Sequence, residues 1–115
     1  MSKRIQVERI RPLTARVGIL GVGHHTYWNQ FDGLLEEIWN KLSAFETIVR
    51  QQDVEVFNLG ISDCAETAYR IVPEIRSANL DLLFIDMLTY ATSSSIAAVF
   101  REIDIPMVLI ALQPM

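Results

Sequence analysis

The sequence predicts an α/β domain in which a parallel sheet is covered by helices on both faces. Four short apolar runs rich in β-branched residues alternate with amphipathic segments along the chain. Strands that are apolar on both faces are typical of a sheet buried on both sides, and the helices between them imply right-handed crossovers. We therefore expect a doubly wound, flavodoxin-like or Rossmann-like three-layer sandwich with strand order 2-1-3-4.

The first half of the chain supplies two strands and a long helix. The first strand is expected over Arg16–Gly23 and the second over Val54–Ile61. The helix between them has one apolar face with a 3.6-residue period, formed by Phe31, Leu34, Leu35, Ile38, Leu42, Phe45 and Val49.

The second half repeats this pattern. Asp63 and Glu66 match an N-terminal capping pattern for a second helix, in which Pro73 predicts a kink or a break. The third and fourth strands are expected over Leu80–Leu88 and Ile105–Leu112. The last helix follows the possible N-caps Ser93–Ser95, and its apolar face is formed by Ile96, Val99, Phe100 and Ile103.

Composition limits the class of protein. The chain has 115 residues, half of them hydrophobic, and a formal net charge of −4. We expect an arm over residues 1–15 and one domain over residues 16–115, the first domain of a longer chain. A single cysteine, Cys64, excludes an internal disulfide framework, and no secretory signal follows Met1, so the expected location is cytoplasmic.

The same features restrict the partners. No apolar run approaches the length of about 20 residues that crosses a bilayer, and the basic residues are scattered, so membrane and nucleic-acid partners are not expected. The fourth strand forms an uncovered edge of the predicted sheet. We therefore expect a homo-oligomer, formed through this edge or through the longer parent chain.

Polar and aromatic residues follow the predicted strands. In a parallel sheet these connections share the carboxyl edge, so His24–Gln30, Ser62–Asp63, Thr89–Ser95 and Gln113 are expected to gather there. Tyr27 and Trp28 beside Gln30 suit a sugar, whose ring faces are apolar and whose edges carry hydroxyl groups. They are equally suited to sealing the end of the core.

Other motifs carry weaker signals. Gly21-Val-Gly23 resembles a dinucleotide loop without its third glycine. His24 and His25 have no further metal ligands at a suitable spacing, so backbone hydrogen bonding or ligand contact is expected of them. Asp86 interrupts an apolar strand near its end, where a buried carboxyl group needs partners or becomes neutral. No nucleophile motif is present.

Four segments, in chain order, resemble the N-terminal domain of the L-arabinose and L-fucose isomerase superfamily. They are Gly21-Val-Gly23, Tyr27–Leu34, Thr89–Ser94 and Leu112–Pro114. Asn29 stands where the family motif has proline. The resemblance spans roughly Arg16 to Met115 and implies a domain that shapes the sugar pocket of an aldose–ketose isomerase.

The resemblance also implies a division of labour. The family uses a divalent metal, typically manganese, whose ligands belong to later domains, so no cofactor and no catalytic residue are expected in this chain. The implied sugar-contacting residues are Tyr27, Trp28, Gln30, Thr89, Tyr90 and Gln113. The alternatives are a stand-alone flavodoxin-like module that binds a small polar ligand without catalysis, and a purely structural assembly domain.

Overall fold

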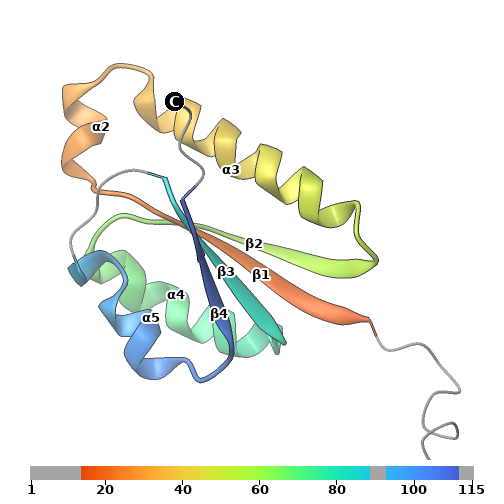
Figure 1. Ribbon diagram of the computed structural model, residues 1–115. Coiled ribbons are helices and arrows are strands. Elements are labelled where there is room, and N and C mark those ends of the chain that lie inside the picture. The colour runs from red at the N-terminus through yellow and green to blue at the C-terminus, as the bar shows by residue number, and fades with distance from the viewer. Residues whose placement is uncertain (1–13, 89–92, 112–115) are drawn as a thin grey trace, which may run out of the picture.

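The computed structural model describes residues 14–88 and 93–111, which form a single sheet flanked by helices (Figure 1). The elements in chain order are β1 (Ala15–Val22), α2 (Thr26–Gln30), α3 (Leu34–Arg50), β2 (Val54–Ser62), α4 (Ala65–Ala78), β3 (Leu82–Met87), the 3-10 turn η1 (Ser93–Ser95), α5 (Ala97–Glu102) and β4 (Met107–Ile110). The expected α/β class is confirmed.

All the strand pairs are parallel, and the order is β2-β1-β3-β4, as predicted. The helix α3 covers one face of the sheet, and α4 and α5 cover the other (Figure 1). The crossover from β1 to β2 runs in one direction across the sheet, and the crossovers from β2 to β3 and from β3 to β4 run in the opposite direction. Because the crossovers are right-handed, opposite directions place their helices on opposite faces. The ends of β1 and β3 therefore flank the point at which the strand order reverses, where open α/β sheets commonly bind ligands.

Two apolar clusters hold the layers together. The cluster beneath α3 contains Val17, Ile19 and Val56 from the sheet, and Ile38 and Leu42 from the helix. The larger cluster on the opposite face combines sheet residues with the apolar faces of α4 and α5, and its buried members include Leu20, Leu83, Ile85, Ile71, Val72, Ile75 and Val99.

A bulge in β2 adjusts which residues face α3. The β1–β2 register shifts between Ile19 and Gly21, and Gly60 has φ 88°, a left-handed conformation that a side chain would strain. The extra residue lets Val56 and Ile61 join the same cluster, although they are five positions apart and would face opposite sides of a regular strand. Ser62 can then turn to the other face, where its hydroxyl group donates to Ser95 O.

Several helix predictions need correction. The segment predicted to connect β1 to the long helix contains the short helix α2, and α3 begins at Leu34. Phe31 and Leu35, both expected in the core, are exposed. Phe31 lies before α3, at the end of α2, and Leu35 follows Leu34, which packs against the cluster beneath α3, so Leu35 lies about 100° around the helix from it. Phe100 of α5 is also exposed, whereas Val99 is fully buried.

The helix α4 also differs from its prediction. Its N-cap is Cys64, one residue after Asp63, and no side-chain cap bond is formed. The helix continues through Pro73 without a break. Proline removes the hydrogen bond to the carbonyl group four residues earlier, which belongs to Tyr69. Because Tyr69 and Pro73 lie on the exposed side of α4, water can solvate that carbonyl group.

Candidate functional site

The carboxyl ends of β1, β2 and β3 are joined by backbone hydrogen bonds. Gly23 N donates to Ser62 O at 3.1 Å, and His25 N donates to Asp63 O at 3.1 Å. Leu88 N donates to Val22 O at 3.0 Å. The ends of three strands thus meet at one edge of the sheet, as predicted for these three, whereas Gln113, after the fourth strand, lies outside the described residues. We call residues 23–31, 62–64 and 88 the carboxyl rim.

The helix α2 presents the first group of predicted sugar-contacting residues at this rim. Tyr27 and Trp28 are half-buried, and Gln30 is exposed. The ring of Tyr27 lies 5.6 Å from that of His24 and 6.2 Å from that of Phe31, measured between centroids. An exposed amide therefore lies one helical turn from a partly exposed group of aromatic rings.

Trp28 fastens α2 to the neighbouring connection. Its indole Nε1 donates to Asp63 Oδ2 at 2.8 Å, while Thr67 Oγ1 donates to Asp63 Oδ1 at 3.1 Å. The ring also packs against the apolar cluster beneath α3. Trp28 thus has the partly buried ring and bonded polar tip of a core-sealing residue, and only the rest of its surface is available to a ligand.

Asp63 is the residue whose role the sequence analysis missed. Its carboxylate accepts hydrogen bonds from Trp28 and Thr67 and does not cap α4. A signal existed, because Asp63 follows the strand that lies beside β1, and parallel strands deliver their connections to one edge. Acidic residues are also common N-caps of helices, so the position of Asp63 before α4 suggested a cap and not a contact across the rim.

The two histidines bond to the backbone. Thr26 N donates to His24 Nδ1 at 3.2 Å, and His25 Nδ1 lies 3.3 Å from Asp63 O. Their rings stack with centroids 5.1 Å apart. Both therefore help to order the rim. Among the described residues, no group of three or more His, Cys, Asp or Glu side chains is arranged to hold a metal ion.

Asp86 lies near the end of β3, paired with Gly21 of β1 and Ile110 of β4. Only 2% of its surface is exposed. Burial raises the pKa of its carboxyl group, and the positive charge of Lys41 opposes that shift. An acid at this place lies beside the reversal of strand order. It also disfavours folding whenever it must be charged.

The pH dependence of stability tests whether burial raises the pKa of Asp86. A raised folded-state pKa means that the folded chain binds more protons than the unfolded chain above the ordinary carboxyl pKa, so stability falls as pH rises through that window. Asp86→Asn should therefore raise the free energy of unfolding near about pH 7, and the gain should shrink toward about pH 4. Urea titrations measure it, with the exposed Asp53→Asn as control. Equal gains at both pH values would contradict the assignment.

Three predicted residues, Thr89, Tyr90 and Gln113, lie outside the described residues. Two surface hollows of about 300 Å³ each are lined wholly by described residues, and both lie at the amino ends of strands. One of them is apolar and is lined by Ala15, Val17, Ile48, Val49, Gln52, Val54, Leu82 and Phe84. These hollows lie away from the rim and offer a competing position for a ligand.

No family model, curated protein or solved structure matches the chain. Within the described ranges, no helix combines the length and apolar character that crossing a membrane requires.

Proposed function

We propose that this chain is the N-terminal, substrate-pocket-shaping domain of a metal-dependent aldose–ketose isomerase similar to the L-arabinose and L-fucose isomerases. The observation that supports this proposal best is the placement of Tyr27, Trp28 and Gln30 on α2 at the carboxyl rim. A partly exposed aromatic group and an exposed amide can contact the apolar face and the hydroxyl groups of a sugar.

The proposed role is positioning. Isomerisation between an aldose and its ketose moves a proton between adjacent carbon atoms, and it requires a base and a group that stabilises the enediolate oxygen. The proposal assigns to the rim the binding and orientation of the sugar. It assigns the base and the metal ligands to other parts of the parent enzyme. The 115-residue chain alone, supplied with manganese, is therefore expected to convert no aldose to ketose.

A titration of the ¹⁵N-labelled chain with L-arabinose tests the binding role. The expected result is a saturable shift of the Trp28 indole resonance and the Gln30 side-chain amide. Gln30→Ala should weaken binding about fivefold or more, because one hydrogen bond contributes about 1 kcal/mol. Gln51→Ala, an exposed glutamine at the opposite end of α3, should leave binding unchanged.

Other outcomes would contradict the proposal. Shifts confined to Val49, Leu82 and Phe84 would place binding in the apolar hollow at the amino ends of the strands. Sugar binding of equal strength in wild type and Gln30→Ala would remove the amide from the site. Isomerisation by the isolated chain would contradict the division of labour.

A further inference from the structure

The two edge strands of the sheet differ in whether side chains bond to their outward backbone groups. β2 forms one edge and β4 forms the other (Figure 1). An edge strand presents backbone N–H and C=O groups that can pair with another chain, and soluble proteins usually cover or blunt them. The difference between these two edges therefore indicates where another strand could add.

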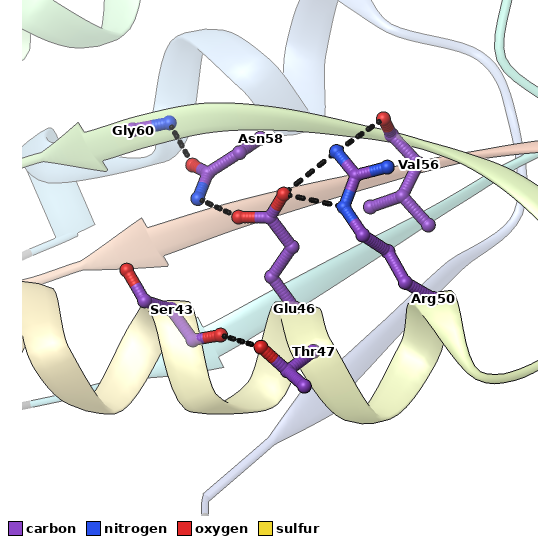
Figure 2. A network of polar contacts seen from close by, with 7 residues as sticks. All are labelled: Ser43, Glu46, Thr47, Arg50, Val56, Asn58 and Gly60. Atoms are coloured by element: carbon purple, nitrogen blue, oxygen red, sulfur yellow. Dashed lines mark hydrogen bonds and ion pairs between the residues drawn. The ribbon is translucent and has the colours of Figure 1, made fainter.

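Side chains cap the edge of β2 (Figure 2). Arg50 Nη2 donates to Val56 O at 3.2 Å, and Gly60 N donates to Asn58 Oδ1 at 2.9 Å. The carbonyl group of Val56 is bonded by Arg50, and the N–H group of Gly60, which lies at the bulge, is bonded by the Asn58 side chain. A further strand would have to displace both hydrogen bonds.

Glu46 of α3 holds this cap in place (Figure 2). Its Oε1 accepts from Asn58 Nδ2 at 2.7 Å, and its Oε2 accepts from Arg50 Nε at 2.8 Å. The hydrogen bond from Asn58 lowers the pKa of Glu46, and Arg50 acts in the same direction, although burial opposes them. The carboxylate is therefore charged at neutral pH and connects the two capping side chains.

The edge of β4 has no such cap in the described ranges. Met107–Ile110 contains no charged residue and no proline, and Val108 and Leu109 are 42% and 56% exposed. Leu83 N donates to Pro106 O at 3.0 Å. Because residue 106 faces β3, residues 107 and 109 present their backbone groups outward. No side chain among the described residues bonds to these outward groups.

One capped edge and one open edge restrict how copies of the sheet can associate. Pairing β4 with β2 of the next copy would be head-to-tail, a contact that can continue into an open filament, and the cap on β2 opposes it. Pairing β4 with β4 is a closed two-fold contact. Identical strands related by such an axis run antiparallel, and here apolar residues meet without any like charges between them.

We propose that β4 pairs with the β4 of a second copy of this chain, forming a two-fold dimer with one continuous sheet. Sedimentation equilibrium of the 115-residue chain should show a monomer–dimer equilibrium. Leu109→Pro removes an outward N–H group and leaves the residues that face β3 in place, so it should raise the dimer Kd at least about tenfold. Leu109→Val keeps that group and serves as the matched control.

A charge exchange tests the same contact without a proline. Leu109→Lys and Leu109→Glu should each weaken the dimer, because antiparallel pairing of the outward residues 107 and 109 makes the two copies of residue 109 diagonal neighbours on one face of the sheet. An equal mixture of the two variants should restore dimers. A monomeric wild type would overturn the proposal. So would an unchanged Kd in Leu109→Pro, or a failure of the mixture to associate. Circular dichroism checks that each variant remains folded.

Discussion

Replacing Leu42 with alanine should lower the free energy of unfolding by about 2–5 kcal/mol. Leu42 is fully buried where α3 meets the sheet, in the smaller of the two apolar clusters. The substitution removes apolar contacts and leaves a cavity that the well-packed strands beneath can fill only in part. Urea unfolding followed by circular dichroism measures the change.

Ile48→Ala provides the matched control for Leu42→Ala. Ile48 lies on the same helix and is 55% exposed, so its truncation should change the free energy of unfolding by about 0.5 kcal/mol or less. Comparable losses in the two variants would contradict the position assigned to α3. The rim depends on that position, because α2 leads directly into α3.

Trp28→Ala should lower the free energy of unfolding by about 2 kcal/mol, and Trp28→Phe by about 1 kcal/mol. Phenylalanine keeps much of the apolar packing but cannot donate to Asp63 Oδ2, whereas alanine loses both contributions. The double variant Trp28→Phe with Asp63→Ala should therefore be more stable than the sum of the single effects predicts.

Trp39→Phe is the control for Trp28→Phe, because Trp39 is a 41% exposed residue of α3. Its effect should stay within about 0.5 kcal/mol. Additive effects of Trp28→Phe and Asp63→Ala would contradict an energetic role for the hydrogen bond between α2 and the connection after β2.

The periodicity of apolar residues explains why the layers of helices and sheet could be predicted from the sequence. The runs around Ile19, Val56 and Ile85 are apolar and short, and the helices between them repeat apolar residues at helical spacing. Both patterns reflect burial directly. Strand order then follows from the handedness of the crossovers and the need to cover both faces of the sheet. These are properties of whole segments, so an error of one residue does not disturb them.

The details of the rim were less predictable because they depend on single contacts. The helix α2 has only five residues, too few to show a period. The bond from Trp28 to Asp63 joins residues 35 positions apart, and Asp63 also matched a local capping pattern that the fold does not use. Of the six predicted sugar-contacting residues, the three on α2 lie at the rim, and the other three are outside the described residues.

The cap on β2 shows the same limit. Glu46 and Arg50 are spaced as an ordinary helical ion pair, which sequence can suggest. Their additional partners, Asn58 and Val56 O, become apparent only when α3 is placed beside β2 (Figure 2).

The central claim is that the connections after β1, β2 and β3 form one rim. Native-state hydrogen exchange tests it most directly, at the amides of Gly23, His25 and Leu88, which donate between these connections. The expected result is that the amides of Gly23, His25 and Leu88 all exchange more slowly than the amide of the exposed residue Asp32. Exchange of all three amides at the rate of Asp32 would show that the connections are separate, and would contradict the account.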